Sequence, residues 1–524
     1  MNERFTGILL QVVFTISIVS AQFQFQFPDD YATPQPARST SVAQAQAQAR
    51  TQQAVQSPTT YKDNSYDQYI TSVVSRGFTK LALDVNRVTQ AISPEVAQAD
   101  YVVYGPVTIT GALGLVLLAS IGQTFDEIAK CLGLSSGELD IQNNPIYVQQ
   151  EIGRVLKSMQ SQTGLDIGYH VKFASAIFIQ QDFPIRPAYL EIADVNYKSN
   201  VMNLDFLGNP QYAKHVINTW VSGHTNGKIP SLLDEAPPPE TNAIVASVLY
   251  FQAAWQFPFF NGHTKLHAFY SNGRKKPSTR MVEMMSNGGE FPYYKDQRLG
   301  VEIMGFPYKG NQTTMYVIMP FQSNKERLRE LENSLTPADI DHLVGNTRYT
   351  ETVTLFPKMR LESTINLRNT LEMMGVKSLF DPDKANLALL SPGVSQKFNE
   401  ANEAPFVSAP ISNQNQINRK LVLPQTEAAG HNAVEELEKI RQQVIQSPVY
   451  ANPGLYADQV IHKVFIDITE SGTEAAAATS ISLNRSGGRV TFRVDVPFLF
   501  FIYHENSRLI LFWGSVKTPP NPAT

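Results

Sequence analysis

The sequence has one cysteine, little net charge and no long apolar run, and each shortage excludes a class of protein. Cys131 stands alone among 524 residues, so neither an intrachain disulfide nor a cysteine-based zinc cluster can form. The net charge of -4 does not indicate a nucleic-acid or anionic-membrane partner. No uninterrupted apolar run reaches the length of about eighteen residues that a membrane-spanning helix needs. The hydrophobic content of 43% instead supports a substantial folded core.

Sequence motifs for catalysis are also missing. The chain has no phosphate-binding P-loop, dinucleotide-binding glycine turn, His-Glu-x-x-His zinc motif or Gly-x-Ser-x-Gly nucleophile turn. Its nine histidines are scattered, and none forms a metal-spaced pair in an expected helix. The sequence does not exclude a Ser/His/Asp triad, because the members of a triad can lie far apart in sequence. We nevertheless expect a protein that is not an enzyme and that binds no cofactor or metal.

Composition divides the chain into a leader, an arm and a folded part. Residues 1–21 have a basic start, an apolar stretch and small residues at the end, which is typical of a secretory signal peptide. Gln, Ala, Ser, Thr and Pro dominate residues 22–65, so this arm is expected to be disordered. One large domain is expected over residues 66–519, interrupted by a polar insertion at 391–454, with a tail at 520–524. We therefore expect a secreted, extracellular protein.

Helical spacing is concentrated early in the folded part and strand-like patterns late, which indicates the α+β class. Helices are expected over residues 69–91, 106–121, 125–132, 217–225, 361–374 and 433–445. Strands are expected over residues 101–104, 171–179, 243–253, 300–305, 313–319, 352–356, 460–468, 490–496, 498–503 and 509–516. Thr124 is expected to cap the helix at 125–132, with Glu127 completing the capping box. The last two strands are expected to form a buried hairpin.

The most unusual stretch is Glu-Ser-Gly-Thr-Glu-Ala-Ala-Ala-Ala-Thr at residues 470–479. Its small side chains supply no anchor in a core, yet they do not obstruct their own burial. In a strand, alternation would place on one face Thr473, Ala475, Ala477 and Thr479, and on the other Glu474, Ala476 and Ala478. A strand that is exposed in one state and buried in another needs a small, uncharged face, because burying an unpaired charge is costly.

Together with its flanking segments, this stretch is similar to the reactive-loop hinge of the serpin family. The hinge residues are Glu470, Gly472, Thr473, Ala475, Ala476, Ala477, Ala478 and Thr479. Similar motifs occur at residues 217–221, 227–229, 249–255, 307–310, 355–359, 373–382, 460–468, 496–502 and 510–516. The resemblance covers residues 66–390 and 455–519. Each motif alone is weak, but their order together with this hinge makes the resemblance specific.

The resemblance implies a metastable serpin fold of three β-sheets, eight or nine helices and an exposed reactive-centre loop. A target protease cleaves that loop, and the hinge side then inserts into the main sheet as a new strand. Thr473 is small and neutral, as the family's inhibitors require. We therefore expect an inhibitor of serine proteases that acts as a suicide substrate. The alternative is a non-inhibitory binding, storage or chaperone protein on the serpin fold, against which the intact hinge argues.

The family's spacing also implies where the loop is cut. Counting from Glu470 gives Ser486 as the residue before the cut, whereas a loop that is one residue shorter gives Arg485. Arginine suits the acidic pocket of trypsin-like proteases and serine suits a small, elastase-like pocket. We favour cleavage between Arg485 and Ser486. The expected partner is a trypsin-like serine protease held in a covalent complex by a monomeric inhibitor, with no nucleic-acid, membrane or heparin partner.

The resemblance assigns four positions to the shutter beneath the main sheet, where the family commonly has two serines, an asparagine and a histidine. The matching positions are Gly105, Thr108, Ser247 and His462. Only the histidine is unchanged, so we expect rewired hydrogen bonds and a structural role for His462. Trp255 matches the breach, the end of the main sheet where the hinge enters.

Two sequons for N-glycosylation are present, at Asn311 and Asn484. The first lies in an expected surface turn, so we expect Asn311 to carry a glycan. The second overlaps the expected cleavage site, where a glycan would obstruct the protease, so we expect Asn484 to be unmodified. The arm and the insertion are similar to those of secreted arthropod serpins, whose usual targets are proteases of immune and melanisation cascades.

Overall fold

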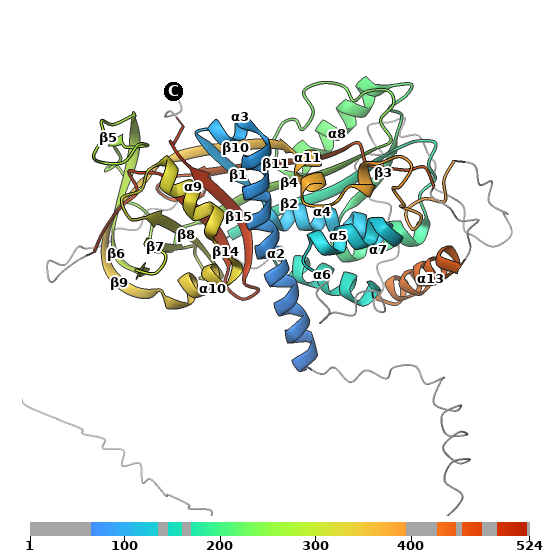
Figure 1. Ribbon diagram of the computed structural model, residues 1–524, viewed down its shortest axis with the longest axis horizontal. Coiled ribbons are helices and arrows are strands. Elements are labelled where there is room, and N and C mark those ends of the chain that lie inside the picture. The colour runs from blue at the N-terminus through green and yellow to red at the C-terminus, as the bar shows by residue number, and fades with distance from the viewer. Residues whose placement is uncertain are drawn as a thin grey trace, which may run out of the picture. The chain divides into compact units, whose positions relative to one another are not determined.

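The computed structural model describes residues 64–134, 145–159, 169–394, 427–446, 453–473 and 490–520. The expected signal peptide, the arm up to residue 63, the loop at 474–489 and the C-terminal tail from 521 lie outside these ranges. Within them, eleven α-helices and fifteen strands form a mixed fold, and the expected α+β class is confirmed (Figure 1). The first helix starts at Asn64, so the last two residues of the expected arm are helical.

The elements follow the chain in an order that puts most strands late. The helices are α2 (Asn64–Ile92), α3 (Pro94–Gln98), α4 (Pro106–Ala119), α5 (Gly122–Cys131), α6 (Pro145–Met159), α7 (Pro187–Tyr197), α8 (Pro210–His224), α9 (Lys325–Ser334), α10 (Pro337–Asn346), α11 (Arg368–Met373) and α13 (Glu427–Gln446), with a 3-10 turn η1 (Ser378–Phe380). The strands are β1 (Tyr101–Tyr104), β2 (Tyr169–Gln180), β3 (Asn200–Leu204), β4 (Ala243–Ala254), β5 (Lys265–Phe269), β6 (Arg280–Asp296), β7 (Val301–Pro307), β8 (Thr313–Pro320), β9 (Arg348–Pro357), β10 (Met359–Asn366), β11 (Gln459–Ile468), β12 (Gly472–Thr473), β13 (Val490–Arg493), β14 (Phe498–His504) and β15 (Leu509–Val516).

The smaller sheet contains the described start of the hinge, residues 472–473. Its strand order is β10-β11-β12-β4-β2-β3, and β11 also pairs directly with β4 in parallel. One face of this sheet packs on α8, where Trp220 meets Phe178 edge-on with ring centroids 5.5 Å apart. The other face packs on α4, whose fourteen residues are all buried. Pro106 in the first turn of α4 has no N–H to leave unsatisfied there, which suits a helix start.

The larger sheet has nine strands in the order β1-β15-β14-β8-β7-β6-β9-β13, with β5 paired to β6 off this path. Hydrogen bonding therefore joins two of the three expected sheets. The cause is the 17-residue strand β6, which pairs with β7 at its C-terminal end and with β5 and β9 over the rest. The expected hairpin at 498–516 is present as β14–β15, and the strands expected at 300–305 and 313–319 also form a hairpin, β7–β8. Every residue of β14 and β15 is buried.

Two local expectations were wrong. Residues 361–366 belong to strand β10 rather than to a helix, and only residues 368–373 are helical. In β10, Leu361 and Ile365 are buried while Glu362 and Thr364 are exposed, which is the alternation of a half-buried strand. Thr124 does not cap a helix but lies inside α5, whose N-cap residue is Ile121. Its hydroxyl instead accepts a hydrogen bond from the backbone N–H of Asn386, at 3.1 Å.

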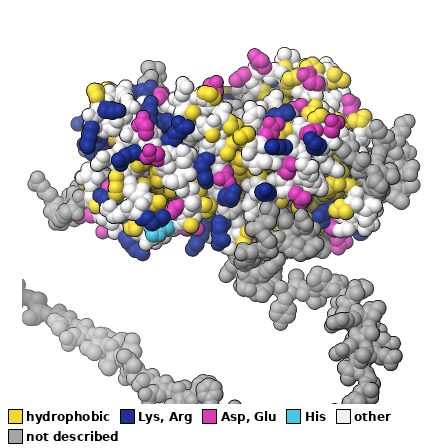
Figure 2. Space-filling view, in the orientation of Figure 1, with side chains coloured by type: hydrophobic (Ala, Val, Ile, Leu, Met, Phe, Trp, Pro, Cys, Tyr) yellow, Lys and Arg dark blue, Asp and Glu magenta, His cyan; other side chains and the backbone are white. Residues whose placement is uncertain are grey.

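The surface carries charges of both signs. Figure 2 shows basic and acidic side chains interspersed over the face in view, with hydrophobic ones between them. Among the described residues, no helix is both long and apolar enough to cross a membrane. The insertion contains helix α13, which includes the helix expected at 433–445.

Candidate functional site

The hinge enters the smaller sheet at a fork between two of its strands. Over residues 459–465 and 244–250, β11 and β4 are hydrogen-bonded to each other. Beyond that point they diverge, and β12 fills the gap: Thr473 lies opposite Ile468 of β11 and Ala253 of β4. We call this line between β11 and β4 the seam. Two residues of the hinge are therefore already placed as the start of an additional strand.

Gly472 fits the fork because it lacks a side chain. Its φ is +147°, a value that L residues with a side chain rarely adopt. A Cβ atom at this position would lie 2.1 Å from the carbonyl oxygen of Ala253. No rotamer change can relieve such a contact, since this oxygen belongs to the backbone of β4. Close approach to β4 therefore requires glycine here.

Thr473 is fully buried and makes one polar contact at the end of the fork. Its Oγ1 lies 3.1 Å from the hydroxyl oxygen of Tyr308. The ring of Tyr308 in turn stacks on Trp255, with ring centroids 4.4 Å apart. Burial raises the pKa of Tyr308 well above its usual range, so the phenol stays neutral. The pocket that receives Thr473 is thus aromatic and uncharged, and it suits a small side chain.

Backbone bonds from the segment after β4 hold the turn that leads into the hinge. The indole N–H of Trp255 donates to the carbonyl of Thr469 at 2.9 Å, and its backbone N–H donates to that of Ser471 at 3.1 Å. The N–H of Phe259 donates to the carbonyl of Glu470 at 2.8 Å. Trp255 therefore fixes both the turn and the tyrosine that contacts Thr473.

The side chain of Glu470 anchors the same turn. Its carboxylate accepts a hydrogen bond from the hydroxyl of Thr264 at 2.5 Å and pairs with Lys358 at 3.1 Å. Burial alone would raise the pKa of Glu470, but these two partners outweigh it and lower the pKa below its usual range. The hinge therefore begins at a fixed, ionised point.

Below the fork, His462 ties the two strands of the seam together. It lies on β11 directly opposite Ser247 of β4, and its Nδ1 is 2.7 Å from the Ser247 hydroxyl. Its Nε2 accepts a hydrogen bond from the N–H of Gly105 at 2.8 Å. Because Nε2 is an acceptor, the proton of the neutral ring sits on Nδ1 and is donated to Ser247. Thr108 Oγ1 lies 3.5 Å from the same Nδ1.

The environment of His462 keeps it neutral. The side chain is fully buried, and burial lowers its pKa from 6.5 to about 3. The four positions matched to the shutter therefore meet at one point beneath the sheet. In place of the side chain that the family commonly uses, a backbone N–H of Gly105 supplies one of the bonds.

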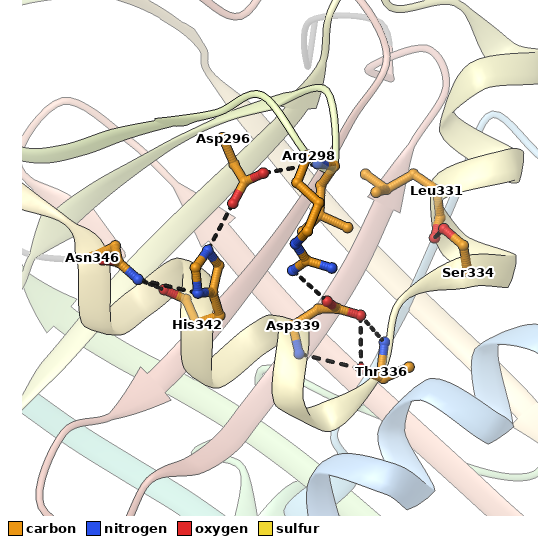
Figure 3. A network of polar contacts seen from close by, with 9 residues as sticks. Asp296, Arg298, Leu331, Ser334, Thr336, Asp339, His342 and Asn346 are labelled. Carbon is orange, nitrogen blue, oxygen red and sulfur yellow. Dashed lines mark hydrogen bonds and ion pairs between the residues drawn. The ribbon is translucent and has the colours of Figure 1, made fainter.

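A second polar cluster, on α10 and the β6–β7 turn, has a different role (Figure 3). His342 Nε2 lies 2.8 Å from the buried carboxylate of Asp296, and the other ring nitrogen faces Asn346 at 3.2 Å. Arg298 pairs with Asp339, which forms the capping box of α10 with Thr336. Both nitrogens of His342 are therefore engaged, one with Asp296 and one with Asn346. This cluster fastens the turn to the helix.

Two further features of the described residues concern metal binding and thiol chemistry. Within the described ranges, no group of His, Cys, Asp and Glu side chains is arranged to hold a metal ion. Cys131 is buried, and burial raises the pKa of its thiol to about 12, which makes it unreactive. The candidate functional site is therefore the seam between β11 and β4.

The predicted site residues fall into two groups. Glu470, Gly472, Thr473, Trp255 and the shutter positions meet along the seam, as described above. The rest of the hinge and the expected cleavage site lie outside the described residues: Ala475, Ala476, Ala477, Ala478, Thr479, Arg485 and Ser486, together with Asn484. Asn311 is exposed in the β7–β8 turn, with a φ of +53°.

Three residues of the site were not predicted from the sequence: Tyr308, Lys358 and Thr264. Tyr308 and Lys358 both lie in motifs that carry the resemblance, which was the available signal. Their contact with the hinge depends on chain segments that are 112 to 206 residues apart, and spacing along the chain does not reveal it. Thr264 lies in none of these motifs, so no feature of the sequence indicated its role.

Comparison with known proteins gives a consistent result. A family model described as "Serpin (serine protease inhibitor)" matches residues 80–519. "Serine protease inhibitor 28Dc" of Drosophila melanogaster is 28% identical over 461 residues, covering 85% of this chain and 80% of that protein. "Intracellular coagulation inhibitor 2" of Tachypleus tridentatus is 28% identical over 419 residues, covering 79% of this chain and 85% of that protein.

Solved structures agree in fold. Human thyroxine-binding globulin, in complex with its hormone, superposes with a TM-score of 0.65 at 19% identity, and the match covers 86% of this chain and all of that one. At this identity the likeness shows the fold alone. The expected three-dimensional arrangement is therefore confirmed, while the partner named for that structure belongs to that protein.

Proposed function

Because this chain belongs to the serpin family, we propose that it inhibits a serine protease as a suicide substrate, with a loop that is cleaved and then inserted into the seam. Inhibition of serine proteases is the activity that the family and the named relatives support, and it is not an enzymatic activity. The mechanism, the trypsin-like target and secretion are the parts that we propose.

The single observation that carries the proposal is the position of Thr473. It is fully buried between β11 and β4 before any cleavage, in a pocket that fits a small, neutral side chain. On the same face of the strand, the next residues to enter would be Ala475, Ala477 and Thr479, which are also small and uncharged. The fork thus has the geometry of an insertion that has started and is paused.

Insertion would continue from the fork down the seam. The β11–β4 hydrogen bonds would be replaced by bonds from each strand to the new one between them, and the His462–Ser247 bond would break. Roughly a dozen loop residues would enter, and each new ladder bond contributes about 0.5–1.5 kcal/mol net. The gain is on the order of 10 kcal/mol. A protease still joined to the loop by its acyl bond would be carried along and its active site distorted.

The cleaved bond in this proposal is Arg485–Ser486. The protease serine attacks the carbonyl carbon of Arg485, the amine of Ser486 leaves, and the acyl-enzyme forms. Arginine selects a trypsin-like pocket with an acidic residue at its base. The alternative assignment, with Ser486 before the cut, would select an elastase-like pocket. We further propose a secreted monomer that carries a glycan at Asn311 and none at Asn484.

The test is complex formation with trypsin and with elastase. We expect a complex with trypsin that survives denaturing electrophoresis, because the acyl bond is covalent. The fragment released from the loop should begin at Ser486 on N-terminal sequencing. A fragment that begins one residue later, with elastase as the trapped enzyme, would reassign the cleavage residue to Ser486. Simple cleavage by several trypsin-like and elastase-like proteases without a stable complex would refute inhibition and favour a non-inhibitory binding protein.

A further inference from the structure

Helix α13, which lies within the insertion, is docked on the body of the protein. Its buried apolar residues are Ala433, Leu437, Ile440 and Val444, which recur at helical spacing along one face. They belong to the main hydrophobic core. Ile445 lies on the flank of this face and is 57% exposed. The helix therefore contributes a full apolar face to the fold.

The docking site of α13 spans two parts of the molecule. Along its length α13 packs against α7, beside which it lies in Figure 1. Leu437 and Arg441 also line a small cleft with Leu389 and with residues of α4, α5 and α6. The guanidinium of Arg441 lies 5.9 Å from the ring centroid of Phe125 on α5. One helix thus touches both α7 and the region around α5.

These two parts belong to opposite sides of the seam. Helix α7 connects β2 to β3, the strands beyond β4. Leu389 and α5 are tied to the other side, because α5 holds η1 through Glu127 and η1 follows β10 and α11. Leu379 of η1 also accepts a backbone hydrogen bond from Ala457, two residues before β11, at 3.1 Å. An added strand would move β4 from about 4.8 Å to about 9.6 Å away from β11.

A direct link between the two sides already exists beneath α13. Arg186, the N-cap residue of α7, donates through its side chain to the carbonyl of Ala388 at 2.9 Å. Its backbone N–H donates to the carbonyl of Leu390 at 3.0 Å. Leu389 lies between these two acceptors in the chain, and it lines the same small cleft as Leu437. Helix α13 therefore adds contact area to the junction that must shift when the seam opens.

We propose that α13 is a brace that holds the seam closed and sets the rate at which the cleaved loop inserts. The inference rests on the proposed inhibitory function, since it concerns the rate of the insertion step. A docked helix slows opening because its apolar contacts to one side must be lost as the two sides separate. Release of the helix would free the seam.

The brace also carries an unfavourable contact that makes it adjustable. Glu191 of α7 faces Glu436 of α13, and burial together with this like charge raises the pKa of Glu191. The Oε1 atom of Glu191 is buried and has no hydrogen-bond partner among the described residues. Removing the charge of Glu436 should therefore tighten docking, whereas removing apolar side chains should loosen it.

The chain offers a matched pair of variants for the test. Ile440→Ala and Ile445→Ala remove the same atoms from the same helix, but Ile440 is 7% exposed and Ile445 is 57% exposed. Trp255 at the fork reports insertion through its fluorescence after mixing with trypsin. We expect insertion to be about tenfold faster in Ile440→Ala, equivalent to about 1.4 kcal/mol in the barrier. Ile445→Ala should match the parent, and Glu436→Gln should insert more slowly.

The results of these experiments test the brace and the insertion mechanism separately. Equal insertion rates in folded Ile440→Ala and Ile445→Ala would overturn the brace, even if Ile440→Ala melts at a lower temperature. If Ile440→Ala does not fold, Glu436→Gln decides, and an unchanged rate in that variant overturns the proposal. A parent protein whose cleavage changes neither fluorescence nor melting temperature would instead refute the insertion mechanism of the proposed function. The two failures are therefore distinguishable.

Discussion

At the scale of single residues, His462 shows how a buried polar group can hold two strands together without a charge. Its two ring nitrogens have opposite roles, one accepting from Gly105 and one donating to Ser247. A protonated ring would have two donors, and the backbone N–H of Gly105 would then face another N–H. Neutrality is therefore a condition of the seam and not only a result of burial.

The first prediction concerns the pH dependence of this residue. Its pKa is about 3 in the folded protein, against a usual value of 6.5. Between these values the unfolded chain binds the proton and the folded chain does not, so the stability that His462 contributes is present above pH 6.5 and is lost as the pH falls toward 3. The loss is on the order of 1.4 kcal/mol for each pH unit in that window. Denaturant unfolding between pH 7 and pH 4 measures it.

Variants separate this residue from the other groups that titrate. His462→Gln should be less stable at pH 7 by about 1–3 kcal/mol, because the seam loses hydrogen bonds. Its stability should also fall less steeply with acid than that of the parent. His215→Gln, at an exposed position on α8, should not alter either value much. Equal slopes in His462→Gln and the parent would contradict a neutral, buried His462.

At the scale of elements, the sequence predicted the helices and strands that are determined by local apolar patterns. The C-terminal hairpin β14–β15 was predicted correctly because two apolar runs flank a polar turn. Strand β11, which precedes the hinge, was predicted correctly because it is an apolar run bounded by polar residues. Residues 361–366 were assigned to a helix, although Leu361 and Ile365 alternate with exposed residues. A separation of four residues fits both periods, so this pair could not decide between helix and strand.

The candidate site could be predicted only where the family pattern marks it. Trp255 and His462 were identified in this way. The contacts of Glu470 with Thr264 and Lys358 join three remote segments, and none of these residue types is unusual on its own. The same holds for the docking of α13: the amphipathic pattern predicted the helix, but no pattern in one chain shows which surface covers its apolar face.

The second prediction concerns β12, the two-residue strand in the fork. Gly472→Ala should expel it, because the new Cβ would meet the carbonyl oxygen of Ala253 at 2.1 Å. The native state should lose roughly 1–3 kcal/mol. The amide of Trp255 should exchange its hydrogen faster, since its acceptor Ser471 moves with the hinge. Denaturant unfolding and hydrogen exchange measure the two effects.

Gly375→Ala serves as the control for this variant. Gly375 has a φ of +100°, and an added Cβ there meets no atom within 4 Å. It therefore carries the conformational strain of a positive φ without the clash. If Gly472→Ala proves no more destabilising than Gly375→Ala and leaves the exchange of Trp255 unchanged, close approach of the hinge to β4 is wrong.

At the scale of the whole molecule, the described structure holds two opposing tendencies. The fork offers a place for a further strand, while the His462–Ser247 bond keeps the seam below it closed. Cleavage would remove the tether that stops the loop from entering. The cleaved protein should then be more stable than the native one, although it has one peptide bond fewer.

The last prediction uses this difference. Cleavage of the parent should raise its melting temperature by more than about 10 °C, as expected for a gain on the order of 10 kcal/mol.

Thr473→Arg places a charge in the uncharged pocket beside Tyr308, and burying an unpaired ion costs several kcal/mol. That cost is smaller than the total gain, so insertion remains favourable at equilibrium, but the entry step slows by about 10²–10³-fold. The protease would then hydrolyse its acyl bond first. We therefore expect Thr473→Arg to be cleaved as a substrate without forming a stable complex, and Thr473→Ala, small and neutral, to inhibit like the parent. Calorimetry and denaturing electrophoresis of the same samples measure both effects, and undiminished inhibition by Thr473→Arg would show that the hinge does not enter the seam.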